Sequence, residues 1–291
     1  MDKDMKIVIL GGNGQLGKEF ENFLKNKAEI YSFSHSELDI LNQELLTKKI
    51  QEIKPEVVIN CSAYTKVDKA EEEKEECIKV NAIGAKNVSY ASYKVGAKVV
   101  YFSSDYIFDG EKGNPYTELD NPNPLSIYGK SKLWGEVYTK EKNPNFLILR
   151  ISWLYGIYGK NFVKTIIKKA KEEKELRIVN DQKGSPTYTL DVVKQTWELI
   201  KRDKVGIYHS TNQGETTWYE FAKKIIEKLN VKTKISPIKT EEYPTLAKRP
   251  KYSVLENYFL KLEGINIMRD WEAALSEFLN IYHTLLLEGE K

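Results

Sequence analysis

Short apolar runs alternate with amphipathic stretches through the first half of the chain. The runs typical of buried strands lie at 6–10, 29–33, 56–60, 97–104 and 146–156, the last running into a loop. Between them, apolar residues recur with helical spacing at 15–26, 42–53, 75–94 and 126–140. This alternation predicts an α/β fold, a Rossmann-like doubly wound parallel sheet wrapped by helices.

The second half continues the pattern less regularly. Helices are predicted at 161–173, 189–202 and 217–230 and from about Asp270, with strands at 176–180 and 206–210. We expect a dinucleotide-binding Rossmann domain at 1–152, to which elements around 176–209 return, and a mainly substrate-binding region at 153–291. Because the sequence shows no flexible linker, this smaller C-terminal region is expected to be tightly docked. The loops at 181–189 and 244–253 are expected to cover a ligand.

Composition excludes several classes of function. The 291 residues are 41% hydrophobic and 30% charged, with a net charge of +3, and this near balance argues against a nucleic-acid binder. There is no apolar run of 18 residues, so no membrane span is expected. Cys61 and Cys77 form no CxxC motif, which predicts a reducing cytoplasmic location and no zinc site. Cys61 is interpreted as a small apolar strand residue.

A glycine motif follows the first predicted strand directly. Gly11, Gly14 and Gly17 form G-x-x-G-x-x-G and lead into the first helix. Glycines allow a tight turn and let backbone N–H groups approach a pyrophosphate, while the helix N-terminus adds partial positive charge. At the first strand–helix turn of a repeating α/β pattern, the motif predicts dinucleotide binding.

The end of the second predicted strand leaves the choice of cofactor open. An acidic residue there would hydrogen-bond the ribose 2′-hydroxyl of NAD, but Ser34 and His35 occupy the position and Asp39 comes later. No arginine is present to clamp a 2′-phosphate either. NADPH is weakly favoured, with NADH also usable. His35 is interpreted equally well as a surface residue or as a phosphate contact.

A tyrosine and a lysine one helical turn apart suggest acid–base chemistry. Four such pairs occur: Tyr90–Lys94, Tyr128–Lys132, Tyr138–Lys142 and Tyr219–Lys223. The second pair alone follows a long loop, opens a helix and comes after a strand that ends in Ser-Ser-Asp. A nearby ammonium lowers the pKa of a phenol, and a serine hydroxyl at a strand end can bond the same substrate oxygen. Tyr128, Lys132 and Ser104 are therefore the predicted catalytic residues.

Longer motifs carry a resemblance to a family. They are GGNGQLG (11–17), NCSAYTKVDKAE (60–71), FSSDYIFDG (102–110), YGKSKLWGE (128–136), RISWLYG (150–156), NFVKT (161–165) and DQKGSPT (181–187). In content and spacing they resemble the dTDP-4-dehydrorhamnose reductases, among the extended short-chain dehydrogenase/reductases. The likeness is strong over about residues 5–190 and looser beyond. The family usually has threonine where Ser104 stands, and serine keeps the hydroxyl.

The resemblance implies roles for individual residues. Tyr128 would be the proton donor, and Lys132 would hold the nicotinamide ribose and lower the phenol pKa. Asp105 and Trp153 would contact the sugar nucleotide, against the simpler roles of capping a turn and packing at the sheet edge. With the glycine loop and the end of the second strand included, the predicted cofactor residues are Gly11, Asn13, Gly14, Gln15, Leu16, Ser34, His35, Asp39, Ile40, Ala63, Tyr64, Thr65, Tyr128 and Lys132.

Further residues carry weaker expectations. Some relatives hold magnesium between subunits with glutamates, and Glu19 could match one of these; the others have no counterpart, so no metal is predicted. Arg249 is assigned either to a diphosphate or to solvent. Trp218, with Phe221 and Ile225, shows the spacing of a core.

The predicted activity is NAD(P)H-dependent reduction of dTDP-4-dehydro-6-deoxy-L-mannose to dTDP-L-rhamnose. The partner is then a nucleotide-sugar substrate, and a homodimer is left open. One alternative is a nucleotide-sugar epimerase or dehydratase of the same superfamily, which retains NAD through its cycle. Another is a non-catalytic subunit resembling the regulatory subunit of methionine adenosyltransferase. The presence of Ser104, Tyr128 and Lys132 argues against that role.

Overall fold

Residues 5–289 are described by the computed structural model, which has a six-stranded sheet at its centre. The strand order is β10–β5–β4–β3–β1–β2, and every neighbouring pair is parallel. In chain order these strands are β1 (Lys6–Leu10), β2 (Glu29–Phe33), β3 (Val57–Asn60), β4 (Lys98–Ser104), β5 (Phe146–Ile151) and β10 (Gly206–His209). The order reverses between β1 and β3, and a parallel sheet of this kind opens a ligand crevice at such a point.

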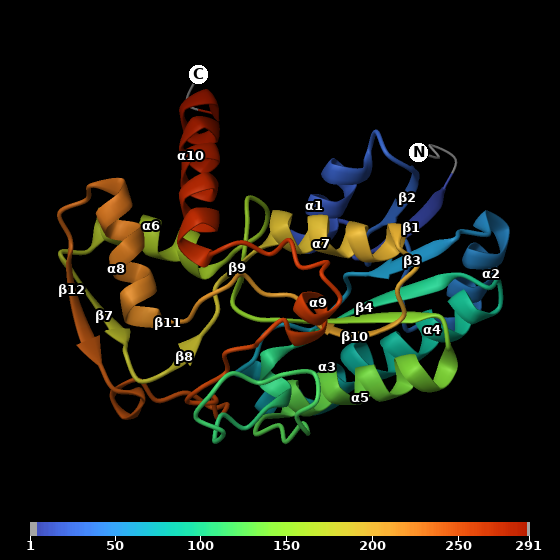
Figure 1. The fold of residues 1–291 in the computed structure, drawn as a ribbon, viewed down its shortest axis with the longest axis horizontal. Coiled ribbons are helices and arrows are strands. Elements are labelled where there is room, and N and C mark those ends of the chain that lie inside the picture. Colours follow the sequence, from blue (N-terminus) through green and yellow to red (C-terminus); the bar gives the residue numbers. More distant parts are fainter. Residues whose placement is uncertain (1–4, 290–291) are drawn as a thin grey trace.

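Helices cover both faces of this sheet, as the doubly wound prediction requires (Figure 1). One face carries α1 (Gln15–Leu24) and α7 (Thr189–Lys201). The other carries α2 (Gln43–Ile53), α3 (Lys74–Ile78), the wide-turned helix η2 (Lys79–Gly84), α4 (Ala85–Tyr93) and α5 (Ile127–Lys142). Alternation along β1 sends Ile7 and Ile9 into the core under α1, and Val8 and Leu10 into the core under α2. The predicted fold class is confirmed.

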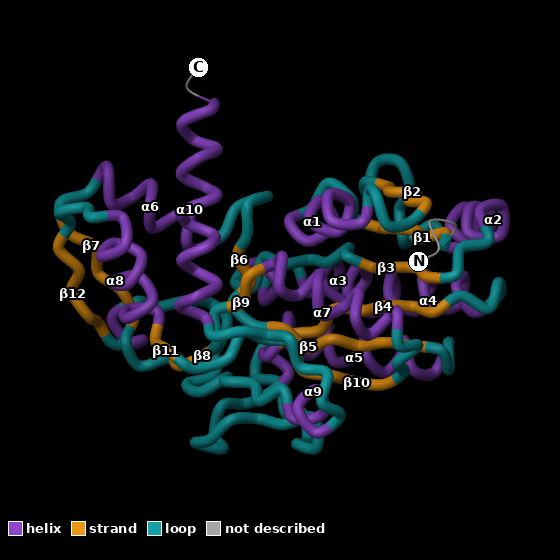
Figure 2. Tube along the Cα trace, turned by 45° about the horizontal axis from the view of Figure 1, so that its top comes forward, coloured by secondary structure: helices purple, strands orange, loops and turns teal. Residues whose placement is uncertain are grey.

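A second region packs beside the sheet (Figure 2). Its helices are α6 (Phe162–Glu172), α8 (Trp218–Leu229) and α10 (Trp271–Gly289), and α9 (Tyr258–Leu262) lies against β10. Its strands form pairs: β6 (Leu154–Tyr155) with β9 (Thr187–Tyr188), β8 (Lys183–Gly184) with β11 (Thr216–Thr217), and β7 (Glu175–Val179) with β12 (Lys234–Ile238). Of the stretch 176–209, β10 joins the main sheet and α7 packs beside α1 on one of its faces, whereas β7 pairs with β12 outside this sheet.

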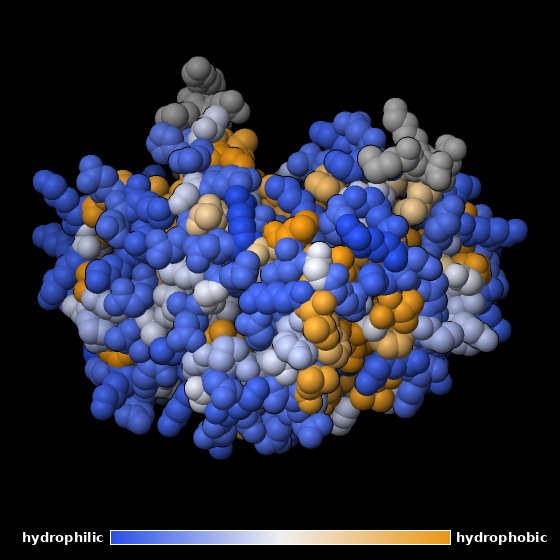
Figure 3. Space-filling model, viewed as in Figure 1, coloured by the Kyte–Doolittle hydropathy of each residue, from blue (hydrophilic) through white to orange (hydrophobic). Residues whose placement is uncertain are grey.

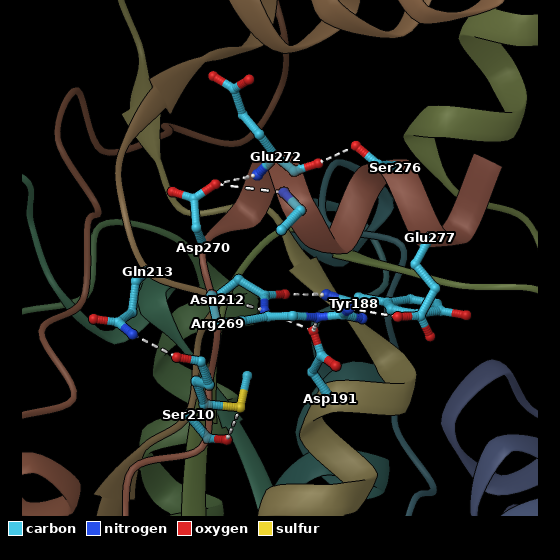
Figure 4. Close-up of polar contacts among 12 residues, drawn as sticks. Tyr188, Asp191, Ser210, Asn212, Gln213, Arg269, Asp270, Glu272, Ser276 and Glu277 are labelled. Atoms are coloured by element: carbon cyan, nitrogen blue, oxygen red, sulfur yellow. Dashed lines mark hydrogen bonds and ion pairs between the residues drawn. The ribbon is translucent and has the colours of Figure 1, made fainter. Parts of the chain in front are cut away.

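Arg269 ties the two regions together (Figure 4). Its Nε donates to Asp191 Oδ2 on α7 at 2.9 Å, and its Nη1 pairs with Glu277 on α10. Asn212 Nδ2 donates to the same Asp191 oxygen at 2.8 Å, and Asn212 Oδ1 accepts from the backbone N–H of Tyr188. A guanidinium that joins carboxylates of two elements fixes their relative position through charge-assisted hydrogen bonds.

The surface is mostly hydrophilic on the face drawn in Figure 3, with hydrophobic residues gathered near α9 and β10. Leu262 of α9 is 70% exposed and Val205, next to β10, is 47% exposed. Within residues 5–289, each helix is too short or too polar to cross a membrane.

Candidate active site

The glycine turn between β1 and α1 is a backbone cradle. Gly11 has a φ of +76°, which side chains with a Cβ rarely adopt. A Cβ at Gly17 would fall 2.3 Å from the Gly11 carbonyl oxygen, so α1 approaches the turn as closely as backbone allows. The N-cap of α1 is Gly14, and the first turn of α1 holds no acidic residue. The partial positive charge of the helix N-terminus is therefore left for an external anion.

A cavity of about 570 Å³ opens beside this turn, at the C-terminal ends of the parallel strands. Ten of the residues predicted for the site line it: Gly14, Gln15, Leu16, Ala63, Thr65, Ser104, Asp105, Tyr128, Lys132 and Trp153. One hollow thus joins the glycine turn, the predicted catalytic residues and the predicted sugar-nucleotide contacts.

Tyr128 lies in the first turn of α5 and lines the cavity. Ser126 caps the helix by accepting from the N–H of Gly129 at 3.1 Å. A Cβ on Gly129 would fall 2.1 Å from the Tyr106 carbonyl oxygen, so α5 begins directly against the turn that follows β4. The Tyr106 and Tyr128 rings meet edge to face, with centroids 5.8 Å apart. Of the four tyrosine–lysine pairs, all within the described residues, Tyr128–Lys132 lines this cavity.

Tyr128 is a neutral phenol in this structure. Burial raises its pKa above the usual value of 10, and the Ser104 hydroxyl counteracts a smaller part of that shift. The lowering of this pKa expected from Lys132 does not appear. A buried phenol that keeps its proton is suited to donate it when a neighbouring oxygen becomes negative.

Lys132 lies on the same helical face but is held by an aromatic ring. Its Nζ lies 4.3 Å from the centroid of the Tyr101 ring, a cation–π contact. Burial lowers the pKa of Lys132 to about 7, and the negative charge of Glu136 opposes this shift. Within residues 5–289, the Lys132 ammonium forms no ion pair of its own.

Glu136 itself belongs to a buried ion pair behind the cavity. Its carboxylate accepts from Arg150 Nε at 2.9 Å and from Arg150 Nη2 at 2.8 Å. Arg150 Nη1 lies 3.4 Å from His209 Nε2, and burial lowers the pKa of His209 to about 3, so this ring is neutral. Arg150 therefore neutralises the charge of Glu136, and this ion pair joins β5 to α5, the helix that carries Tyr128 and Lys132.

Asp105 follows Ser104 at the end of β4 and accepts from two hydroxyls. Ser104 Oγ donates to Asp105 Oδ1 at 3.0 Å, and Ser253 Oγ donates to Asp105 Oδ2 at 2.6 Å. Burial raises the pKa of Asp105 to about 7, although both hydroxyls lower it. Ser104 also serves as N-cap of the short turn that follows, accepting from the N–H of Tyr106. The site thus has a carboxyl group that titrates near neutrality next to the predicted catalytic hydroxyl.

Trp153 reaches the cavity from a strained position. Its φ is +43°, in the left-handed region that non-glycine residues rarely adopt. Its indole stacks on that of Trp218, with centroids 3.5 Å apart and planes 8° from parallel. A Cβ on Gly184 would fall 2.3 Å from Trp153 Cε2, so the loop at 181–187 also packs against the ring. Trp218 supports Trp153 in addition to the core role predicted for it.

The remaining predicted cofactor residues lie outside the lining of this cavity. They are Gly11, Asn13, Ser34, His35, Asp39, Ile40 and Tyr64. Gly11 belongs to the glycine turn itself, and Ser34 and His35 lie on the turn after β2. Ser34 also holds the carboxylate of Glu37, at 2.6–2.8 Å, so an acidic group lies on this turn although none directly follows β2.

Several lining residues were missed. They are Asn60, Cys61, Ser62, Phe102, Ser103, Ile151, Ser152, Leu154, Gly159 and Lys160. Most lie at or just after strand ends, and the position of ligand crevices in parallel sheets was the signal that could have found them. Cys61, interpreted from the sequence as a small apolar strand residue, lines the cavity, and burial raises its pKa, which keeps the thiol protonated.

Two charged residues with open assignments have partners inside the protein. Arg249 forms a bidentate pair with Asp68, at 3.0 and 2.8 Å, so its guanidinium already has a carboxylate partner. Glu19 is 4% exposed and accepts from Thr189 Oγ1 at 2.7 Å, joining α1 to α7. Across residues 5–289, no three His, Cys, Asp or Glu side chains are grouped to hold a metal ion.

The chain matches the family model described as "RmlD substrate binding domain" over residues 5–284. In the crystal structure of a dTDP-4-dehydrorhamnose reductase from Clostridium acetobutylicum, the matched chain is 46% identical, with a TM-score of 0.94 over 96% of this chain and 100% of that one. This chain belongs to the RmlD family of dTDP-4-dehydrorhamnose reductases.

Two further comparisons extend this result. The Bacillus anthracis dTDP-4-dehydrorhamnose reductase in complex with NADP is 45% identical, with a TM-score of 0.93 over 95% of this chain and 99% of that one. The spore coat polysaccharide biosynthesis protein SpsK of Bacillus subtilis is 39% identical over 275 residues, which are 94% of this chain and 96% of the relative. The resemblance indicated by the motifs is confirmed, and the family match also covers the C-terminal part, where the motifs were less similar.

Proposed function

We propose that this protein reduces dTDP-4-dehydro-6-deoxy-L-mannose to dTDP-L-rhamnose with NADPH, NADH being an alternative cofactor. One observation carries the proposal. A single cavity brings a neutral phenol, a lysine and a serine hydroxyl together beside an unneutralised helix N-terminus. A keto sugar nucleotide and a reduced dinucleotide are the reactants that such a cavity fits. The family's named relatives, one of them bound to NADP, support the same conclusion.

The chain's residues fit the dinucleotide at a place that the backbone itself defines. A Cβ at Gly17 would fall 2.3 Å from the Gly11 carbonyl oxygen, so only glycine lets the start of α1 pack this closely on the turn. Gly14, Gln15 and Leu16 would hold the pyrophosphate against the start of α1. Ala63 and Thr65, after β3, would lie along the cofactor. When bound, the reduced nicotinamide supplies the hydride for the reaction.

The protein's own part in the reaction is to polarise and protonate the ketone oxygen. As the carbonyl carbon gains a hydride, its oxygen becomes negative and takes the Tyr128 phenol proton, giving the alcohol. The Ser104 hydroxyl has a single hydrogen, which it gives to Asp105 Oδ1 in this structure and would turn toward the substrate oxygen when the sugar binds. The Lys132 ammonium stabilises the phenolate that remains. Burial of these groups strengthens each of these interactions.

The sugar nucleotide is assigned to the other side of the cavity. Trp153 and Asp105 would contact it, and the region at 153–291 would be the substrate-binding part, with the cofactor held by the Rossmann part at 1–152. A cytoplasmic location and a homodimer remain predictions.

Tyr128→Phe tests the proposal. This variant should fold, bind NADPH with unchanged affinity and lose nearly all turnover, measured as NADPH oxidation with dTDP-4-dehydro-6-deoxy-L-mannose. Tyr138→Phe removes a phenol from the same helix outside the cavity and is the matched control. Retained activity in Tyr128→Phe would rule out the phenol as proton donor. Conversion of a nucleotide sugar without net cofactor oxidation would instead favour an epimerase or dehydratase.

A further inference from the structure

The turn after β2 holds one carboxylate oxygen between two donors. The backbone N–H of Ser34 donates to Glu37 Oε2 at 2.8 Å, and Ser34 Oγ donates to the same oxygen at 2.6 Å. These two hydrogen bonds lower the pKa of Glu37 below its usual value, so the side chain is ionised at neutral pH. In residues 5–289 the Glu37 carboxylate has no cationic partner within ion-pair distance.

This carboxylate lies where a dinucleotide fold meets the adenosine ribose. The N–H of Gly12, in the glycine turn, donates to the carbonyl of Phe33, the last residue of β2, at 2.8 Å. A Cβ on Gly12 would fall 2.0 Å from Ser32 Oγ, so the turn and the end of β2 are in direct contact. In such folds the residues after the second strand contact the ribose 2′ position. Ser34 follows β2 directly, and its two hydrogen bonds to Glu37 hold that carboxylate at the same place.

The geometry points to Glu37 as the residue that sets the choice between NADH and NADPH. This inference rests on the proposed function, because it concerns the cofactor of the same site. A carboxylate here can accept a hydrogen bond from the ribose 2′-hydroxyl of NADH while remaining bonded to Ser34. A 2′-phosphate of NADPH bound to the two Ser34 donors would compete with this carboxylate and would be repelled by its like charge. Glu37 therefore lowers the protein's preference for NADPH.

The groups around Glu37 carry charges of both signs. Lys48 and Lys49 line one hollow together with Glu37, and Lys49 Nζ pairs with Glu52 Oε2 at 3.2 Å. His35 Nε2 lies 3.6 Å from Asp39 Oδ1, and the Asp39 side chain also accepts from the N–H of Leu41 at 2.9 Å. Asp39 adds a second negative charge at this corner. A role of Glu37 confined to capping the turn is the competing explanation, and it predicts equal effects on both cofactors.

The test is a direct titration of NADPH and NADH into the full-length protein, followed by intrinsic fluorescence, for wild type, Glu37→Gln and Glu37→Ala. Removing the carboxylate should tighten NADPH binding by about tenfold, the effect of one charge-assisted hydrogen bond, while NADH binding stays equal or weakens. Adenosine 2′,5′-bisphosphate should show the same gain over AMP. Glu44→Gln, an exposed carboxylate in the first turn of α2, is the control and should change neither.

The outcomes separate the two proposals. A NADPH-to-NADH affinity ratio that is equal in wild type and both Glu37 variants would overturn the inference and leave the proposed function standing. An equal loss for both cofactors would show that Glu37 only caps the turn and would also overturn it. A wild-type protein that binds neither dinucleotide would overturn the proposed function, and the inference with it.

Discussion

The Ser253 hydroxyl donates a 2.6 Å hydrogen bond to Asp105 Oδ2 and so connects residues 148 positions apart in the chain. Ser253 is 1% exposed and Asp105 is 2% exposed. The backbone N–H of Ser253 donates to the carbonyl of Lys183, which fixes the segment that carries the hydroxyl. The C-terminal region thereby orients the carboxyl group that follows Ser104.

Ser253→Ala should weaken binding of the sugar nucleotide more than it slows turnover. Asp105 loses a donor and the orientation that this donor gives it, so KM for the keto sugar nucleotide should rise by about tenfold, with kcat within about twofold of wild type. Steady-state kinetics at saturating NADPH give both values. Ser236→Ala is the control, because Ser236 also donates to a carboxylate, that of Glu175, but far from the cavity. An unchanged KM would show that Asp105 is held without Ser253.

Asp105 should make the protein less stable as pH rises. Its pKa is about 7 in the folded protein against an ordinary value of 3.8, so the folded state binds this proton more tightly. The stabilising effect of protonation is fully present below about pH 4 and is lost as pH rises through 7. At about 1.4 kcal/mol per pKa unit, the whole change is at most about 4 kcal/mol.

Asp105→Asn removes this titration and is the variant to compare. The free energy of unfolding is measured with denaturant between pH 4 and 8. The value for Asp105→Asn minus the value for wild type should increase with pH. Parallel pH profiles for the two proteins would contradict a raised pKa for Asp105.

The sequence predicted the main sheet well because each central strand is buried on both faces. Such strands read as continuous apolar runs, as at 6–10 and 97–104, and the helices between them carry a clear apolar stripe. The short pairs in the second region, such as β6 with β9, were not predicted. Two-residue strands have no periodicity of their own, and their pairing depends on tertiary contacts between distant loops. The predicted helix at 75–94 is divided into α3, η2 and α4, since local wide turns leave no sequence signal.

Part of the site was equally readable and part was not. Gly14, Tyr128 and Lys132 fall in motifs whose spacing carries their chemistry, and they line one cavity. The sequence did not indicate Glu37, because the acidic residue that binds the ribose 2′-hydroxyl is expected directly after the second strand. A carboxylate three residues later reaches that position only because the chain turns back on itself.

Glu136→Gln should shift the pH dependence of activity. Lys132 loses a nearby negative charge, and Arg150 keeps its positive charge without a partner, so the pKa of Lys132 should fall further below about 7. The ammonium form is present below that pKa and is lost as pH rises. The basic limb of the kcat profile should therefore move to lower pH by about one unit.

Loss of a buried ion-pair partner also destabilises, by about 3–5 kcal/mol. The double variant Glu136→Gln/Arg150→Met removes the uncompensated charge and should recover stability relative to the single variant. Glu141→Gln, an exposed glutamate on the same helix, should leave the pH profile unchanged. A kcat profile for Glu136→Gln that coincides with that of wild type would show that Glu136 has only a structural role.

Trp218→Ala should impair sugar-nucleotide binding without touching the cofactor. Trp153 loses the ring that stacks 3.5 Å away, and its left-handed backbone position then has less support. An aromatic pair contributes about 0.5–1.5 kcal/mol beyond its buried area, so KM for the sugar nucleotide should rise by about threefold to tenfold. Trp218→Phe keeps a stacking ring, so its KM for the sugar nucleotide should lie between those of wild type and Trp218→Ala. Trp134→Ala, at a position 47% exposed on α5, should have the KM of wild type. If Trp218→Ala raised KM for NADPH as much as for the sugar nucleotide, the stack would serve the whole cavity rather than the position of Trp153.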